Sequence, residues 1–361
     1  MTALELPADV PASPADFLQA AMDWHFSPET GSSFWLERAR SLGFDPRKDV
    51  RCFDDLKLFP NVANELRDVP ARDLIPRGYG ADPDIVGVYE SGGTTGPPKR
   101  IVLLRDWWDR MLSWHLQHVE AAGIPRGRDW LALAPSGPHI VGEMVREQAV
   151  RLGGIRFAID MDPRWVKKLI AAGKVDEAEA YAEHLIDQAA FVLRTQGIGV
   201  LMSTPPLLER LARRDDLVDL VRSKLQAIVW GGAHMDPDTR RLYRTEVFPG
   251  VALTGGYGST MVLGGAVERL DADPDGPCIF DGYSPYITFC VVDRETHRTV
   301  PYGDRGQVVM NHVSRSFLLP NNLERDMATR VRPPVGHVGD SVADVTPVQR
   351  FDDETVIEGV Y

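Results

Sequence analysis

The chain has 361 residues, of which 43% are hydrophobic and 25% are charged. This composition is typical of a folded globular protein, and the length suits one large domain or two to three subdomains. The net charge of −12 argues against binding to nucleic acid or to an anionic membrane, because both select basic surfaces. Lys99, Arg100 and Arg105 form a local cluster of positive charge, which is compatible with a small anionic ligand.

The cysteines and the apolar segments indicate a cytoplasmic protein. Cys52, Cys278 and Cys290 are too few and too far apart for a disulfide framework or a zinc site. No apolar run approaches the roughly 20 residues that span a bilayer. The N-terminus lacks the basic and apolar regions of a signal peptide. We therefore expect a reducing cytoplasm, with no membrane partner.

Residues 1–85 are predicted to form an N-terminal helical region. Ser13 is a candidate N-cap for a helix over 13–26, and Pro14 suits its first turn. A second helix is predicted over 32–43, where Gly43 ends it.

Strands and helices alternate after this region. The predicted strands cover 84–90, 100–104, 129–137, 155–160, 198–203, 225–232 and 251–259. The predicted helices cover 105–124, 140–154, 176–197, 205–221 and 237–248. This alternation predicts an α/β core over 86–270 with a mainly parallel sheet, in which ligands bind at the carboxyl ends of the strands.

Short strands follow the predicted core. They are expected over 286–293, 306–313 and 337–345, and they predict a smaller β-rich subdomain over 271–361.

The segment SGGTTGPPK, residues 91–99, connects the first two predicted strands of the core. Its glycines allow the backbone to approach a phosphate closely, and its threonines and Lys99 add donors and a positive charge. It differs from the nucleotide P-loop, in which Ser or Thr follows the lysine on a helix. A mobile surface loop is the alternative interpretation.

This segment resembles the phosphate-binding signature of the acyl-adenylate-forming superfamily, which includes acyl- and aryl-CoA synthetases and peptide-synthetase adenylation domains. Gly93 to Lys99 match that signature, whereas Gly92 stands where serine or threonine is usual. The resemblance implies that the loop binds the phosphates of ATP through the following residues: Ser91, Gly93, Thr94, Thr95 and Gly96.

Further motifs follow in the order of that superfamily. STPPLLERL (203–211) is similar to the segment after its central strand, and VWGGAH (229–234) resembles a turn that lines the acyl and adenine pockets. GGYGST (255–260) resembles its Tyr-Gly-x-Thr-Glu motif, GHVGDSVADV (336–345) its Thr-Gly-Asp motif, and RFDDETVIEGVY (350–361) its hinge. The nucleotide contacts implied by these motifs are Gly232, Ala233, Gly256, Tyr257, Gly258, Asp340 and Arg350.

The resemblance also implies the chemistry. An organic carboxylate attacks the α-phosphorus of ATP, and the products are an acyl-adenylate and pyrophosphate; ATP and Mg²⁺ are the implied cofactors. Lys99 and Thr260 would contact phosphates, and His139 would lie near the acid carboxylate, so these three residues are the predicted catalytic residues. The short chain looks closest to the aryl-acid-activating branch found in phenazine-antibiotic pathways.

The sequence departs from the superfamily pattern at two points. The glutamate that usually binds Mg²⁺ is replaced by Met261, whose thioether is a poor ligand for a hard cation. The mobile C-terminal domain is expected to be absent, because the chain stops at Tyr361, just after the hinge-like segment. In the superfamily this domain carries a lysine that contacts the acid carboxylate and the α-phosphate during adenylation. The resemblance therefore leaves three alternatives: a partner protein supplies that lysine, the chain adenylates unaided and more slowly, or it no longer catalyses.

The acid is predicted to be aromatic, with hydroxyl or amino substituents. Because glycine has no side chain, a glycine-rich segment leaves a flat slot that suits a ring. The residues expected to form this slot are Trp230, Gly231, Gly232, Gly255 and Gly256. His139 has an alternative role as a turn residue that bonds to backbone. The expected partners are the acid, then CoA, a carrier protein or another acyl acceptor; an oligomer is possible.

Two other functions compete with adenylation. A non-catalytic protein that binds the acid or the acyl-adenylate would fit Met261 and the missing domain. A phosphotransferase is disfavoured because the Gly-Lys-Ser/Thr ending is missing. His115 and His118 are interpreted as surface residues of a helix, and Trp107, Met111 and Trp114 as core residues of the same helix.

Overall fold

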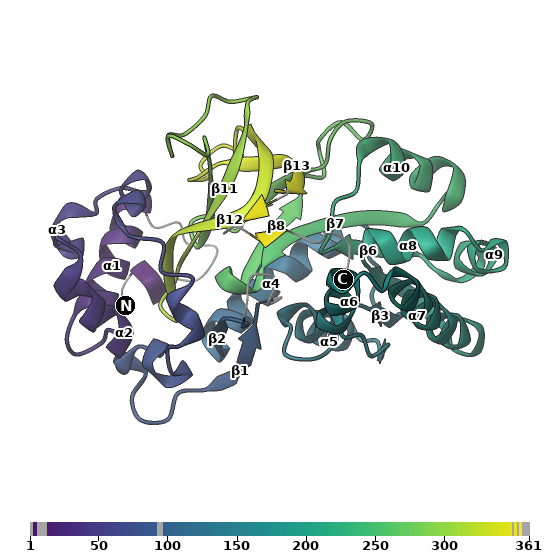
Figure 1. Ribbon diagram of the computed structural model, residues 1–361, viewed down its shortest axis with the longest axis horizontal. Coiled ribbons are helices and arrows are strands. Elements are labelled where there is room, and N and C mark those ends of the chain that lie inside the picture. The colour runs from purple at the N-terminus through teal and green to yellow at the C-terminus, as the bar shows by residue number, and fades with distance from the viewer. Residues whose placement is uncertain (1–2, 6–12, 92–96, 349, 352–353, 356–361) are drawn as a thin grey trace.

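The computed structural model describes all residues except 1–2, 6–12, 92–96, 349, 352–353 and 356–361. Its α-helices are α1 (Pro14–Phe26), α2 (Ser33–Arg38), α3 (Pro46–Asp49), α4 (Arg105–Ala121), α5 (Ile140–Arg151), α6 (Pro163–Ala171), α7 (Val175–Thr195), α8 (Pro205–Ala212), α9 (Asp215–Lys224) and α10 (Pro237–Leu242). Figure 1 shows α1–α3 at one end of the molecule and α7–α9 at the other.

The strands form one large sheet and two small ones. They are β1 (Ile85–Glu90), β2 (Arg100–Leu104), β3 (Asp129–Leu133), β4 (Arg156–Ala158), β5 (Ile198–Ser203), β6 (Ala227–Gly231), β7 (Ala252–Ser259), β8 (Gly264–Glu268), β9 (Ile279–Gly282), β10 (Ile287–Val292), β11 (Arg305–Val313), β12 (Leu318–Val331), β13 (Ser341–Pro347), β14 (Arg350–Phe351) and β15 (Glu354–Thr355). β1 and β2 form a separate antiparallel hairpin, and β14 pairs with β15.

The large sheet confirms the predicted α/β class. Its order is β10-β11-β12-β13-β9-β8-β7-β6-β5-β3-β4. The pairs among β4, β3, β5, β6 and β7 are parallel, and the pairs from β7 to β10 are antiparallel. The β-rich part therefore continues the sheet of the α/β core, and the boundaries at 85/86 and 270/271 stay predictions.

Local chemistry explains several helix ends. The Ser13 hydroxyl accepts a hydrogen bond from the Asp16 amide at 3.1 Å, and Pro14 begins α1 as predicted. The segment predicted as one helix over 205–221 forms two helices, α8 and α9, because Arg213 and Arg214 between them are not helical. The predicted helix over 237–248 ends as α10 and continues as one π-helical segment, Tyr243–Val247.

β12 is the largest element that the sequence did not predict. Its sequence, LLPNNLERDMATRV, contains proline and asparagine near its start, and these residues usually mark turns. Pairing with β11 on one side and β13 on the other overrides that local preference. Asn321 has a φ of 53°, and the β11–β12 register shifts nearby. β8, β9 and α6 were also not predicted.

The core stripe of α4 was predicted correctly. Trp107 and Met111 are buried, and the Trp107 indole donates to the Leu263 carbonyl at 2.9 Å. Trp114 stacks on Tyr283 with ring centroids 4.4 Å apart. The three cysteines are free thiols. Among the described residues, no helix combines the length and apolarity required to cross a bilayer.

Two histidines are buried where the N-terminal helices meet the sheet. His25 Nε2 lies 2.7 Å from the Ser314 carbonyl, and His312 Nδ1 lies 2.6 Å from the Val262 carbonyl. His25 Nδ1 has no hydrogen-bond partner in the described structure. Burial lowers the pKa of His25 from 6.5 to about 4 and that of His312 to about 3. Both rings are therefore neutral at pH 7.

Acidification from pH 7 to pH 5 should destabilise the protein. The unfolded chain binds protons at these histidines near pH 6.5, whereas the folded chain binds them only near pH 4 or below. The free energy of unfolding should fall by about 2 kcal/mol per buried histidine over this range. Urea titrations at several pH values measure the free energy of unfolding as a function of pH. His25→Gln should reduce the pH slope and the exposed His297→Asn should not; an unchanged slope in His25→Gln contradicts the assignment.

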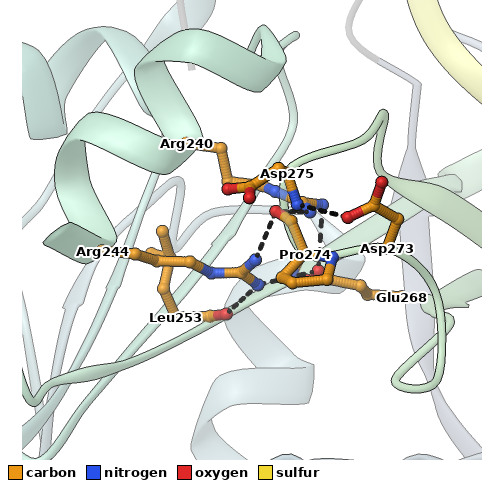
Figure 2. Close-up of polar contacts among 8 residues, drawn as sticks. Arg240, Arg244, Leu253, Glu268, Asp273, Pro274 and Asp275 are labelled. Atoms are coloured by element: carbon orange, nitrogen blue, oxygen red, sulfur yellow. Dashed lines mark hydrogen bonds and ion pairs between the residues drawn. The ribbon is translucent and has the colours of Figure 1, made fainter.

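A buried carboxylate joins the parallel and antiparallel parts of the sheet (Figure 2). Glu268, at the end of β8, accepts hydrogen bonds from Arg240 at 3.1 Å and from Arg244 at 3.0 Å. Its second oxygen accepts from the Gly255 amide of β7 at 2.7 Å. Arg240 and Arg244 also donate to the Pro274 carbonyl, at 2.9 and 3.3 Å. One side chain thus fixes α10, β7 and β8 together.

Glu268→Ala should destabilise the protein by about 3–5 kcal/mol, because it leaves the buried Arg240 charge without this carboxylate. Chemical denaturation measures the loss. Glu209→Ala is the matched control: it breaks an ion pair with Arg213 in which both side chains are exposed, so it should cost at most about 1 kcal/mol. Equal losses in the two variants would contradict the role given to Glu268.

Candidate active site

A cavity of about 310 Å³ opens where β3, β5, β6 and β7 end. Its wall includes the residues that directly follow three of these strands, Ala134, Thr204 and Gly232. Residues of β12 also line the cavity, and these are Asn322, Leu323, Glu324, Arg325 and Asp326. The cavity therefore lies at the edge of the sheet where the strand pattern predicted a ligand site.

The base of the glycine loop contributes two of the predicted residues. Ser91 and Lys99 line the cavity; Ser91 directly follows β1, and Lys99 directly precedes β2. The Ser91 amide donates to the Lys99 carbonyl, and the Lys99 amide donates to the Ser91 hydroxyl, both at 3.0 Å. The predicted phosphate contacts Gly93, Thr94, Thr95 and Gly96 lie outside the described residues. The two ends of the loop are thus held together at the cavity wall.

The glycine turn after β6 also lies at the cavity. Gly231, Gly232 and Trp230 line it, whereas Ala233 and Gly255 do not. A side chain at Gly255 would lie 2.6 Å from the Trp230 indole, so Gly255 makes room for that ring. Gly232 has a φ of +81°, which favours glycine. The indole fills part of the slot that was predicted from the glycines.

The GGYGST segment supplies the middle of the wall. Gly256, Tyr257, Gly258 and Thr260 line the cavity, and the Tyr257 hydroxyl donates to Asp326 at 2.9 Å. Burial, with the nearby Asp326 and Glu324 carboxylates, raises the pKa of Tyr257 well above its usual value. The phenol therefore stays protonated and is a permanent donor.

Asp340 does not line the cavity, although its motif predicted a ribose contact. Its carboxylate is buried, pairs with Arg330 at 2.9 Å and accepts from the Val291 amide at 3.2 Å. Burial raises the pKa of Asp340, while the Arg330 guanidinium acts in the opposite direction. Its contacts tie β10, β12 and the start of β13 together. Arg350 lies in the short strand β14, and its side chain is not described.

His139 lines the cavity at the N-terminus of α5. Its backbone amide donates to the Gly137 carbonyl at 2.7 Å, while its side chain makes no capping hydrogen bond. Burial and the positive charges of Arg164 and Lys167 lower the pKa of His139 to about 4. The imidazole is thus a neutral group at pH 7.

Several cavity residues were not predicted from the sequence. His115 of α4 and Gln148 of α5 line the wall, and the His115 Nδ1 and Gln148 Nε2 atoms lie 2.7 Å apart. The expectation that His115 is a surface residue was wrong. Glu324 and Asp326 were missed because β12 was not predicted as a strand. Their spacing of two residues places them on one face of β12, which was the available signal.

Comparison with known proteins gives a family match over part of the chain. Residues 180–314 match the family described as AMP-binding enzyme. A comparison with curated protein sequences finds no match. Two solved structures of 2-hydroxyisobutyryl-CoA ligase are similar. One is in complex with 2-HIB-AMP and CoA, at 18% identity and a TM-score of 0.62, and the match covers 94% of this chain and 68% of that protein. The other is in the postadenylation state with 2-HIB-AMP, at 17% identity and a TM-score of 0.62, with 97% and 74% covered.

The fold is similar to that of a CoA ligase, and the family match adds a segment of the AMP-binding enzyme type over residues 180–314. That segment is less than half of the 361-residue chain, and the acyl-adenylate-forming superfamily is what the sequence motifs resemble. The structural likeness, at this identity, adds only the shared fold.

Replacement of the two aspartates should separate their roles. Asp326→Asn should weaken AMP binding about tenfold or more with little change in melting temperature, because Asp326 lines the cavity and accepts the Tyr257 hydroxyl there. Asp340→Asn should lower the free energy of unfolding by about 3 kcal/mol and leave AMP affinity within about twofold, because Arg330 loses its partner. Calorimetric titration and thermal unfolding measure both, and the reverse pattern would restore Asp340 as the nucleotide contact.

Proposed function

We propose that this protein uses ATP to convert an organic carboxylic acid, preferentially an aromatic one, into an acyl-adenylate with release of pyrophosphate. The acyl group then passes to CoA, a carrier protein or another acceptor. The observation that carries the proposal is the single cavity, whose wall combines Lys99, Tyr257 and Thr260 with an apolar face of α5. One cavity thus offers polar groups for a nucleotide beside apolar groups for an acid.

The transfer depends mainly on positioning and on neutralisation of phosphate charge. In this proposal Lys99, together with the loop that starts at Ser91, holds the phosphates. Thr260 donates to the α-phosphate, and the adenine packs on Tyr257 beside Gly256 and Gly258. Support for these roles comes from the shared wall, which contains all of the described residues named here.

Asp326 takes the ribose role that the motif had suggested for Asp340. Its carboxylate lies at the cavity and already accepts the Tyr257 hydroxyl at 2.9 Å. A carboxylate next to the adenine-packing ring is well placed to accept hydrogen bonds from sugar hydroxyls. Arg350 is retained as a nucleotide contact on the resemblance alone.

Magnesium would enter with the ATP phosphates and would need only one or two protein carboxylates. The described residues contain no cluster of three or more metal-binding side chains. Met261 lines the cavity where the superfamily has a carboxylate, but Glu324 lines it too. The Glu324 carboxylate accepts from the Asn322 amide at 2.7 Å, which leaves lone pairs for a cation. The residues present therefore fit Mg²⁺, with Glu324 as its ligand.

His139 is proposed to orient the acid carboxylate. A neutral imidazole can donate a hydrogen bond to a carboxylate oxygen without withdrawing the negative charge that the attack requires. The lowered pKa of about 4 keeps the ring in this state across the neutral range.

A protein that binds the acid or the acyl-adenylate without catalysis is the second candidate, and Met261 favours it. Pyrophosphate exchange into ATP, measured over a panel of aromatic acids with detection of AMP, separates the two functions. Exchange with any acid supports the enzyme. Binding of acids or of an acyl-adenylate analogue without exchange supports the binding protein, and ADP as the product would contradict both.

Lys99→Ala should reduce pyrophosphate exchange by about 100-fold or more, because it removes a positive charge from the phosphates in the transition state. Lys174→Ala is the matched control, since Lys174 pairs with Glu177 at an exposed surface. It should exchange at the wild-type rate. Equal activity of Lys99→Ala and the wild type, at matched folding, would remove Lys99 from the reaction.

A further inference from the structure

The cavity has an apolar side that ends at a polar pair. Along α5 the cavity-lining residues are Ile140, Val141, Met144, Val145 and Gln148, whose spacing places them on one face of the helix. The first four are apolar. From Ile140 to Gln148 the helix rises about 12 Å, which is the length of a substituted aromatic or two-ring acid. His139 begins this face, and Gln148 ends it.

The polar pair joins α4 to α5. Gln148 is 2% exposed, and its amide nitrogen lies 2.7 Å from His115 Nδ1. An amide nitrogen can only donate, so Nδ1 accepts. Burial lowers the pKa of His115 to about 4, and the positive charge that His118 carries when protonated acts in the same direction. The neutral ring therefore carries its proton on Nε2, which is the atom it can offer to a ligand.

The wall of the cavity contains a second donor. Trp230 lines the cavity and is 3% exposed, and its indole Nε1–H has no hydrogen-bond partner among the described residues. A buried donor without a partner is unfavourable, and an acceptor on the ligand removes that cost. His115 is of intermediate exposure and lines the same cavity.

We infer that the His115–Gln148 pair selects acids that carry an uncharged hydrogen-bond acceptor at the end remote from the carboxylate. A ring nitrogen, a carbonyl or a hydroxyl oxygen would accept from His115 Nε2–H, while the apolar face of α5 packs on the ring system. Gln148 is a positioning residue, because it acts by fixing which nitrogen of His115 is protonated. This inference rests on the proposed function, since it assumes that the cavity holds the acid.

The test uses acids that differ by a single atom. Each quinoline carboxylate is compared with the naphthoate of the same shape, in which CH replaces the ring nitrogen. Calorimetric titration of the full chain measures binding without a need for turnover. The wild type should bind at least one quinoline carboxylate about tenfold or more tightly than its naphthoate, because a hydrogen bond separates the two ligands.

Two variants assign the preference. His115→Phe keeps an aromatic ring but removes the donor, and Gln148→Met keeps the volume but no longer fixes the tautomer. Both should bind the members of each acid pair within about twofold of one another. Gln117→Ala, at an exposed position of α4, should keep the wild-type ratio. Circular dichroism and melting temperature establish that each variant is folded, and the two variants test the pair independently.

The outcomes separate this inference from the proposed function. A wild type without preference in any pair, a preference that survives in His115→Phe, or no acid binding at all overturns the inference. Pyrophosphate exchange with acids that show no such preference leaves the proposed function intact and defeats only the selection by His115. A nitrogen-dependent preference without exchange supports the inference and points instead to the binding protein.

Discussion

The carboxylate of Glu268 is the constraint on which the site depends. It lies where the parallel strands end and the antiparallel strands begin, and it binds two arginines that follow β6 and the backbone of β7 (Figure 2). The bond to the Gly255 amide fixes the strand that continues into Tyr257 and Thr260. A buried ion pair contributes little net stability compared with apolar packing, but its geometry is specific. In this protein the ion pair mainly fixes the position of β7.

Close backbone contacts extend the same constraint along the cavity. A side chain at Gly265 would lie 2.1 Å from the Tyr257 carbonyl, and one at Gly231 would lie 2.8 Å from the Gly256 carbonyl. Glycine is therefore required at Gly231 and Gly265 for reasons of strand packing. The same small residues leave space on the cavity side, so one choice of residue serves both the sheet and the ligand. Gly231 and Gly265 both line the cavity, so the glycines required by strand packing also mark the site.

The parts of the fold with strong local patterns could be predicted, and the parts made by distant pairing could not. Helices α4, α5 and α7 and the parallel strands follow apolar periodicity and turn residues. β12 could not be predicted, because neighbouring strands impose its extended form on a polar sequence. The consequence for the site is direct. Asp340 was chosen from a motif, while Asp326, which faces the cavity, lay in a segment without a predicted element.

The charges around the cavity favour an anionic ligand despite the net charge of −12. Burial and the positive charges of Arg325 and Arg164 lower the pKa of Lys167 to about 6. Arg164 also lowers the pKa of His139, and Lys167 acts in the same direction when it is protonated. A polyphosphate would offset their repulsion and would raise the pKa of Lys167, so nucleotide binding would couple to proton uptake. His115 lies on α4, next to Gln148 near the C-terminal end of α5, and burial rather than Arg164 lowers its pKa. The Arg164 charge therefore acts near the His139 end of α5, whereas an uncharged pair lies at the Gln148 end. That asymmetry suits a ligand with phosphates at one end and an apolar ring at the other.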